Sequence, residues 1–519
     1  MIYPVIKEDI SLVTTDGVRL DADLYRPESL DSFPVLLMRQ PYGRQIASSV
    51  VYAHPKWYAS QGYLVVIQDV RGCGTSEGDF TLFEKEIEDG FETVNWAANL
   101  RGSSGLVGMY GFSYQGMTQL YAAANSPKPL KTICPAMAPY DVYEDLAYEN
   151  DVFYYELNLA WAIQLAAIKA KKIGDHLAYK SIYLASKSLP VHGLSLQLQE
   201  HLRQYAPSNF YYQWQTLARD HPYWLKISPK SFLESLDLPM LHIGGAFDTY
   251  LRGTLKLYQA MSDRSKYHQS LIVGPWSHLP WTRKVAEIDY GPEASSNIDK
   301  LQIDWFDTFL KGKRNNFTSV NWFQMGSNQW ISGKSLNQGT EQIFFLSSEG
   351  LANIREDNGK LVLQIPKDKL TDVIVHDPWR PVPSLGGHAS LLAGTFERSN
   401  LDSRSDVLTY TSEPLQDGLS MIGDIRITLE LQVDNYSFSL AIILSQVTKS
   451  AKIYNFSQGF AHFSRSSRQE ISLQPTYYKI PPGDSLRLSI SASYFPSMPL
   501  NPELTTLNLL SGKISLKIQ

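Results

Sequence analysis

Short apolar runs alternate with helix-like stretches through the first half of this 519-residue chain, and this rhythm constrains its fold more than any other feature. The runs are too short for helices, whereas 87–100 and 114–124 place apolar residues at helical spacing. Strands without polar alternation are typical of a parallel sheet with helices on both faces. We therefore predict an α/β fold, with strands at 33–38, 63–69, 106–113, 130–136, 238–245 and 269–275.

Other segments follow different patterns. Residues 8–27 alternate around the turn Asp16-Gly17, which predicts a β-hairpin because glycine tolerates a positive φ. Residues 140–236 contain amphipathic stretches such as 155–171 but no strand-like runs, which indicates a helical insertion. From about residue 335, short alternating strands follow one another, as in a sandwich or jelly roll.

Three parts are therefore expected. Residues 1–139 and 237–334 would form the α/β domain, and 140–236 a helical cap inserted into it. Residues 335–519 would form a β jelly-roll domain. The length agrees, since domains average roughly 150 residues.

Composition and charge exclude several classes of protein. The 47 basic and 52 acidic residues give a net charge of −5, so neither nucleic acid nor a membrane is an expected partner. Two cysteines are too few for a disulfide framework, and the first ten residues lack the features of a secretory signal, so we expect a cytoplasmic protein. The apolar tract 158–170 is too short to span a bilayer.

Residues 109–118, MYGFSYQGMT, read as a strand ending near Ser113 and a helix starting directly after it. A serine on such a tight turn is lifted above the sheet, in the arrangement called a nucleophile elbow. The spacing departs from G-x-S-x-G, because Gln115 stands where the second glycine is usual and Gly116 follows it. On its own the motif fits an N-cap serine with packing glycines equally well.

A serine nucleophile needs a histidine that removes its proton and a carboxylate that orients the histidine. In α/β-hydrolases the acid and then the histidine follow the serine along the chain, each just beyond a strand. Asp248 and His278 meet both conditions. Singly, Asp248 could cap the next helix and His278 could be structural; together they favour a Ser-His-Asp triad.

Motifs along most of the chain support this interpretation. They are RQPYGR (39–44), QDVRGCGTSEG (68–78), YGFSYQG (110–116), GAFDTY (245–250), GPWSH (274–278), DWFDTFLKG (304–312), MGSNQW (325–330), HDPWRPVPSLGG (376–387) and YFPSMPLNP (494–502). Together they resemble the CocE/NonD type of acyl hydrolase, which comprises cocaine-esterase-like and X-Pro dipeptidyl-peptidase-like serine hydrolases. The resemblance implies an α/β-hydrolase core with a helical cap and a C-terminal jelly roll.

The same resemblance implies roles for individual residues. Ser113 would be the nucleophile, His278 the general base and then acid, and Asp248 its orienting partner. Tyr42 would donate its phenolic hydrogen to the oxyanion, together with the backbone N–H of Tyr114. The product of the first step would be an acyl-enzyme.

The acyl pocket is expected to be apolar or aromatic, lined by Tyr250, Trp161, Tyr154 and Phe153. The cap aromatics could equally form the core of the insertion. Some relatives bind an α-ammonium group with acids next to the triad aspartate, but the segment 249–252 holds none. The cap acids Glu149, Asp151 and Glu156 are the alternatives.

We expect an esterase acting on a small-molecule ester with a hydrophobic or aromatic acyl group. The alternatives are an amide-cleaving acylase, an X-Pro dipeptidyl-peptidase-type aminopeptidase and, from another class, a jelly-roll binding protein without catalysis. X-Pro peptidases carry an added N-terminal helical domain, whereas this chain enters its first hairpin by residue 8. Neither a metal nor another cofactor is expected, because no metal-ligand spacing appears. Whether the protein forms a homo-oligomer stays open.

Overall fold

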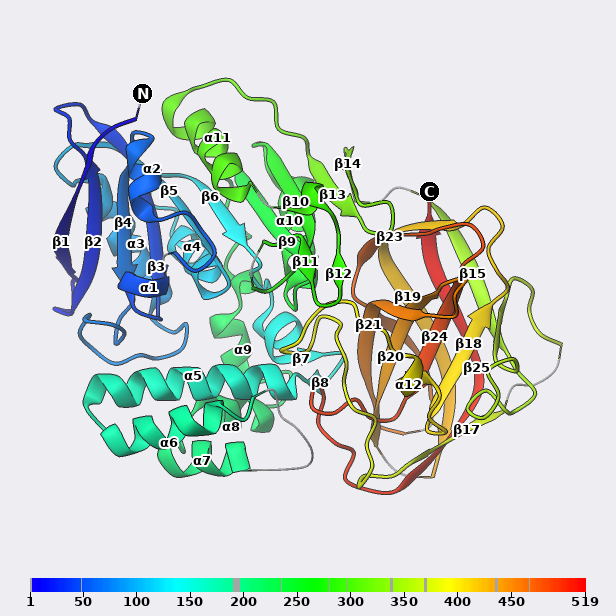
Figure 1. The fold of residues 1–519 in the computed structure, drawn as a ribbon. Coiled ribbons are helices and arrows are strands. Elements are labelled where there is room, and N and C mark those ends of the chain that lie inside the picture. The colour runs from blue at the N-terminus through cyan, green and yellow to red at the C-terminus, as the bar shows by residue number, and fades with distance from the viewer. Residues whose placement is uncertain are drawn as a thin grey trace.

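A computed structural model describes residues 2–47, 49–189, 197–234, 236–279, 281–295, 297–336, 339–367, 371–434, 437–465 and 467–519. Figure 1 shows a sheet with helices, a group of helices along one end of that sheet, and a β-rich body beside both. The predicted fold class, an α/β-hydrolase core with a helical cap and a β jelly-roll-like domain, is confirmed. No helix among the described residues is long and apolar enough to span a bilayer.

A ten-stranded sheet forms the core of the α/β domain. Its order is β1 (Val5–Val13), β2 (Arg19–Pro27), β4 (Leu64–Asp69), β3 (Phe33–Gln40), β5 (Ser103–Phe112), β6 (Leu130–Ala136), β9 (Met240–Phe247), β10 (Gln269–Ser277), β13 (Val320–Gln324) and β14 (Gln329–Gly333). The strands from β4 to β13 pair in parallel, and β1, β2 and β14 add antiparallel pairs at the edges. Each strand predicted from an apolar run occurs in this sheet.

Helices cover both faces of the sheet, as the buried strands require. On one face lie α3 (Glu86–Ala98), α4 (Tyr114–Ala124) and α10 (Leu251–Arg264); on the other lie α2 (Pro55–Ser60) and α11 (Ile298–Lys311). Successive residues of β3 point to opposite faces: Val35 and Leu37 pack on the first set, and Leu36 and Met38 on the second. The short elements of this domain are α1 (Arg44–Ala47), β11 (Lys284–Val285), β12 (Ile288–Asp289) and a 3-10 turn at Pro292–Ala294.

The cap (residues 140–236) is mainly helical, as its amphipathic stretches predict. Its helices are α5 (Tyr155–Ile173), α6 (His176–Ser186), α7 (Gln197–Tyr205), α8 (Phe210–Thr216) and α9 (Pro222–Ile227), with a 3-10 turn at Pro229–Ser231. It begins with a π-helix, Val142–Ala147, and a ribbon of β7 (Tyr148–Glu149) and β8 (Val152–Phe153), which sequence patterns did not predict. Helix α5 ends at Ile173 and is followed by Gly174, whose φ of 75° suits the left-handed C-cap.

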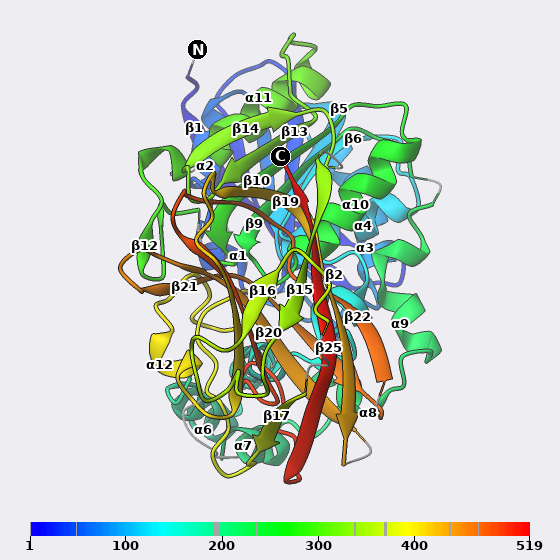
Figure 2. The ribbon, with the colours of Figure 1, turned by 90° about the vertical axis from the view of Figure 1, so that its right-hand side faces the viewer.

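The β domain (residues 335–519) holds an eleven-stranded sheet. Its order is β21 (Ile453–Phe463), β20 (Phe438–Val447), β24 (Ser485–Ser491), β18 (Val407–Ser412), β16 (Lys360–Val362), β15 (Thr340–Ser347), β25 (Thr505–Ile518), β19 (Leu419–Val433) and β22 (Ser467–Ser472), with β17 (Asp372–His376) on β25 and β23 (Thr476–Ile480) on β19. One short helix, α12 (Ser399–Asp402), lies outside it. Figure 2 shows β25, in red, running along this domain.

Candidate active site

Ser113 lies on the turn between β5 and α4, with a φ of 58° and a ψ of −126°. Its backbone N–H donates to the carbonyl of Ala136, 2.9 Å away, which fixes the turn against β6. Such a strained backbone is expected of the serine in a nucleophile elbow. Although Ser113 occupies the N-cap position of α4, its side chain makes no capping hydrogen bond.

The side chain of Ser113 instead contacts His278, and His278 in turn contacts Asp248. His278 follows β10, and its Nε2 lies 3.0 Å from Ser113 Oγ. Its Nδ1 lies 2.7 Å from Oδ1 of Asp248, which follows β9 and is completely buried. Asp248 does not cap α10; that position belongs to Tyr250. Because a carboxylate only accepts hydrogen bonds, Nδ1 carries a proton and Nε2 is free to accept one from Ser113.

Both residues expected to supply the oxyanion donors line the same cavity as Ser113 and His278. The backbone N–H of Tyr114 belongs to the first residue of α4, which has no intrahelical acceptor for it. Tyr42 follows β3, and its ring lines the same cavity as Ser113 and His278. Its backbone N–H donates to Gln40 Oε1 at 2.7 Å, which anchors the loop to the sheet. Burial raises the pKa of the Tyr42 phenol, so it is protonated at neutral pH.

A cavity of about 490 Å³ opens over Ser113 between the three parts of the chain. Tyr250 lines it and packs edge-on against His278, with ring centroids 5.0 Å apart. Trp161, on α5, also lines this cavity. The apolar part of the lining comes from Val50, Phe83, Phe112, Met117, Pro139, Leu146, Leu157, Ala160, Ile168, Phe247, Leu279, Leu391 and Ala393. Tyr114, Gln115, Gln164, Thr249 and Ser277 add uncharged polar groups.

Two of the four expected pocket residues lie elsewhere. Phe153 is buried inside the cap, where its ring packs against Tyr148 and Tyr211. Tyr154 is completely buried at the junction of the cap with the β domain and donates to Glu149. The prediction that both line the pocket is therefore wrong. A run of aromatics shows that side chains are buried but not against which partner.

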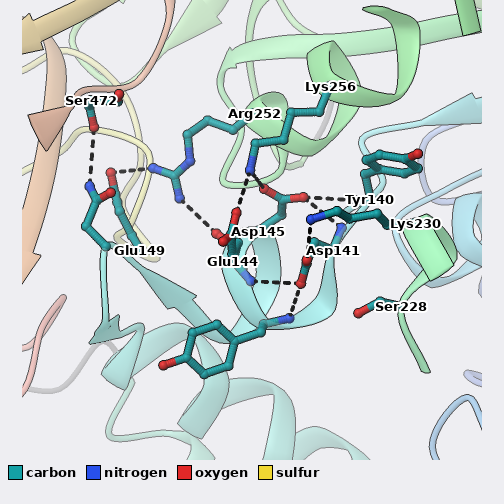
Figure 3. Close-up of polar contacts among 12 residues, drawn as sticks. Tyr140, Asp141, Glu144, Asp145, Glu149, Ser228, Lys230, Arg252, Lys256 and Ser472 are labelled. Atoms are coloured by element: carbon teal, nitrogen blue, oxygen red, sulfur yellow. Dashed lines mark hydrogen bonds and ion pairs between the residues drawn. The ribbon is translucent and has the colours of Figure 1, made fainter. Parts of the chain in front are cut away.

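The cap acids considered for binding an ammonium group are engaged in other contacts. Glu149 is buried and forms an ion pair with Arg252 of α10 (Figure 3) and a 2.9 Å hydrogen bond with His388 Nε2. Burial alone would raise the pKa of Glu149, but Arg252 and His388 outweigh it and hold this pKa below its usual value. Asp151 pairs with Arg219 at the surface, 3.1 Å away.

Glu156 is the third of these acids. It is buried beside the loop of the β domain and accepts from the backbone N–H of Leu391 at 3.3 Å. Neither Glu156 nor the other two acids belongs to the lining of the cavity. The described residues therefore offer no carboxylate from the cap to a ligand in this cavity.

The β domain reaches the site, which sequence reasoning missed. Gln474 donates to the backbone carbonyl of Asp248 at 2.8 Å, and the hydroxyl of Thr249 donates to the carbonyl of His388 at 2.7 Å. His388 and Ser390 also line the cavity. No local motif marks these residues, because their role depends on how the two domains pack.

Comparison with known proteins supports, along most of the chain, the family resemblance that the motifs indicate. The family model for the X-Pro dipeptidyl-peptidase (S15 family) matches residues 16–280, and that for the X-Pro dipeptidyl-peptidase C-terminal non-catalytic domain matches residues 315–518. Cocaine esterase from Rhodococcus sp. (strain MB1 Bresler) is 30% identical over 452 residues, which cover 82% of this chain and 77% of that protein.

Solved structures agree with the fold. An aminopeptidase from a marine sediment archaeon, Thaumarchaeota archaeon, superposes with a TM-score of 0.84 at 19% identity, covering 100% of this chain and 97% of that one. An α-amino acid ester hydrolase superposes with a TM-score of 0.78 at 20% identity, covering 99% and 97%. The resemblance read from the motifs is thus confirmed: the chain belongs to the X-Pro dipeptidyl-peptidase (S15) family, as a serine hydrolase related to cocaine esterase.

Proposed function

We propose that this protein is a serine esterase that hydrolyses small esters of neutral apolar or aromatic acyl groups. Ser113 is the nucleophile, His278 the general base and acid, and Asp248 the residue that orients His278. The 3.0 Å and 2.7 Å contacts that join the three side chains support these roles. A serine hydroxyl needs such a base to act as a nucleophile at neutral pH.

The reaction proceeds in two halves. Ser113 Oγ forms a bond to the ester carbonyl carbon while its proton passes to His278 Nε2, and the carbonyl oxygen becomes an oxyanion. The bond to the alcohol then breaks, and His278 returns the proton to the leaving alcohol. Water next attacks the acyl-enzyme, gives its proton to His278 and releases the acid, after which the proton returns to Ser113 Oγ.

The two proposed oxyanion donors lower the barrier to formation of the acyl-enzyme and the barrier to its hydrolysis. The phenol of Tyr42 and the backbone N–H of Tyr114 would stabilise the negative charge as it develops on the carbonyl oxygen. A preorganised donor of this kind contributes about 3 to 4 kcal/mol to a barrier. The protonated state of Tyr42 and the free N–H at the start of α4 support this assignment.

The proposal about the substrate rests on the residues that line the cavity. Among the described residues that line it there is no Asp, Glu, Lys or Arg. An ammonium or carboxylate on the acyl group would lose its hydration there without gaining a charged partner, which costs several kcal/mol. The same argument disfavours X-Pro dipeptides, whose acyl part ends in an α-ammonium group. Neutral acyl groups lose nothing comparable and gain contact with the apolar wall.

A matched pair of substrates tests this proposal. Phenylacetyl and phenylglycyl esters of one phenol differ only in an α-ammonium group. At a pH where the amine is protonated, we expect the phenylacetyl ester to have a kcat/KM about 100-fold higher. Equal values, or a preference for the amino ester, would contradict the neutral-acyl assignment.

Two further arms complete the experiment. Ser113→Ala should abolish turnover of both esters, and turnover that survives would remove Ser113 from the proposal. The anilide of phenylacetic acid, compared with its aryl ester, separates an esterase from an amide-cleaving acylase, since both would use the same residues. We expect the ester to be the faster substrate.

A further inference from the structure

Among the cap residues that the structure describes, one polar contact reaches the proposed catalytic machinery. Trp161 lies on α5, and its indole Nε1 donates a hydrogen bond to the phenolic oxygen of Tyr42 at 3.1 Å. Trp161 therefore does more than form an apolar wall. It binds the group proposed to stabilise the oxyanion.

The chemistry of a phenol makes the direction of this bond informative. A phenolic oxygen has one hydrogen to donate and can accept from other donors. The indole N–H can only donate, so the Tyr42 hydrogen must point away from Trp161. Among the described residues, no acceptor for this hydrogen is found. The bond thus leaves it available to a ligand.

The indole is itself held in place. Its ring contacts three aromatic residues, with centroid distances of 6.2 Å to Phe83, 4.9 Å to Phe210 and 6.3 Å to Trp214. The backbone of Tyr42 is anchored to the sheet through Gln40. Tyr42 is therefore fixed from the sheet on one side and from the cap on the other.

We infer that Trp161 is a positioning residue for oxyanion stabilisation, which directs the Tyr42 hydroxyl hydrogen toward the reacting carbonyl. This inference rests on the proposed function. A hydrogen bond accepted by a phenol also polarises its O–H, and such cooperativity strengthens the bond that the phenol donates. The effect grows as charge develops, so it acts on the transition state more than on bound substrate.

The variant Trp161→Phe removes the N–H and keeps an aromatic wall. With p-nitrophenyl acetate and p-nitrophenyl phenylacetate, we expect kcat and kcat/KM to fall by the same factor, roughly 3- to 10-fold, with KM within about twofold of wild type. The factor should be equal for the small and the large acyl group. An unchanged kcat, or a KM that rises with acyl size, would reduce Trp161 to a pocket wall and overturn the inference.

A double-mutant cycle adds a readout that a purely structural role would not move. In a Tyr42→Phe background no phenolic oxygen exists to accept the bond, so Trp161→Phe should leave kcat unchanged. If Trp161→Phe lowers kcat by the same factor in both backgrounds, it does not act through Tyr42, and the inference fails.

The cap provides a matched control. Trp224 is buried in the cap, and its indole donates to the backbone carbonyl of Ala218 at 3.0 Å, outside the cavity over Ser113. Trp224→Phe removes an indole hydrogen bond in the same way, so it should lower thermal stability but leave kcat unchanged. An equal loss of kcat would show that both variants merely loosen the cap. If Ser113→Ala loses all activity while Trp161→Phe keeps the kcat of wild type, this inference is refuted and the proposed function still stands.

Discussion

Ser113 has a φ of 58° and a ψ of −126°, a conformation that few side chains adopt, and glycines make room for the turn. A Cβ at Gly111 would lie 2.5 Å from the Cβ of Gln115, and one at Gly116 would lie 2.8 Å from the carbonyl oxygen of Ala136. The departure from G-x-S-x-G is thereby explained. Gly111 leaves space for Gln115, and the close approach to β6 occurs at the next position, Gly116.

The first prediction concerns this turn. Gly111→Ala should lower the free energy of unfolding by about 2 kcal/mol or more, because the added Cβ overlaps Gln115 and φ is 144°. It should also reduce kcat by displacing Ser113. Gly105→Ala, at a φ of 83° with nothing within 4 Å, is the control and should cost only about 1 kcal/mol. Equal losses measured by urea unfolding would contradict the steric explanation.

The second prediction concerns the phenol of Tyr42. Tyr42→Phe should lower kcat by about 100-fold or more with little change in KM, because the hydroxyl acts on the oxyanion rather than on the ground state. Steady-state kinetics with a neutral aryl ester measures both constants. A kcat close to wild type would assign the oxyanion to other donors.

At the scale of elements, burial decided what could be predicted. Strands such as β3 and β9 are buried along their whole length, so their apolar runs are unmistakable, and α4 begins and ends at the predicted residues. The ribbon of β7 and β8 was missed because its strands have only two residues each. Strand β21 lacks a clean alternation of polar and apolar residues, because it buries the polar side chains of Asn455, Ser457 and Gln458.

The residues of the site also divide into those that could be predicted from the sequence and those that could not. Ser113, Asp248 and His278 each stand beyond a strand of one parallel sheet, so chain order alone was enough to expect their meeting. The hydrogen bonds from Trp161 to Tyr42 and from Gln474 to Asp248 join residues more than 100 positions apart in different parts of the chain. No local pattern encodes such contacts.

The third prediction concerns β9, which leads into Asp248. His242 is completely buried in this strand, and burial lowers its pKa to about 4. The unfolded chain, with an ordinary histidine pKa of about 6.5, takes up a proton that the folded protein does not. The free energy of unfolding should therefore fall as the pH drops from about 6.5 to about 4, by up to roughly 3 kcal/mol from this residue.

The variant His242→Gln isolates that contribution. Its urea midpoint should depend less on pH between about 6.5 and 4 than that of wild type, whatever its absolute stability. Parallel pH dependences in the two proteins would show that His242 does not contribute in this range.

At the scale of the whole molecule, the three parts meet in one buried polar junction. Arg252 of the α/β domain, Glu149 and Tyr154 of the cap, and His388 of the β domain form it, and His388 also lines the cavity. Arg252 donates to the Tyr154 hydroxyl at 2.7 Å. Arg252 lies in the first turn of α10, shortly after Asp248 in the sequence, so the junction adjoins the site.

The fourth prediction tests this junction. Arg252→Met leaves Glu149 buried without its main partner, which should cost about 3 to 5 kcal/mol of stability and lower the melting temperature. The double variant Arg252→Met/Glu149→Gln removes the unpaired charge as well and should recover part of that loss. A double variant that is less stable than Arg252→Met would contradict a charge-based role. Thermal unfolding measures all three proteins.

The central claim is that Ser113 is the nucleophile activated by His278, and covalent labelling tests it most directly. A fluorophosphonate probe followed by mass spectrometry of the digested protein should place one adduct on Ser113. Ser113→Ala should carry none, and His278→Ala should react far more slowly than wild type. An adduct on another residue, or labelling that persists in Ser113→Ala, would contradict the account.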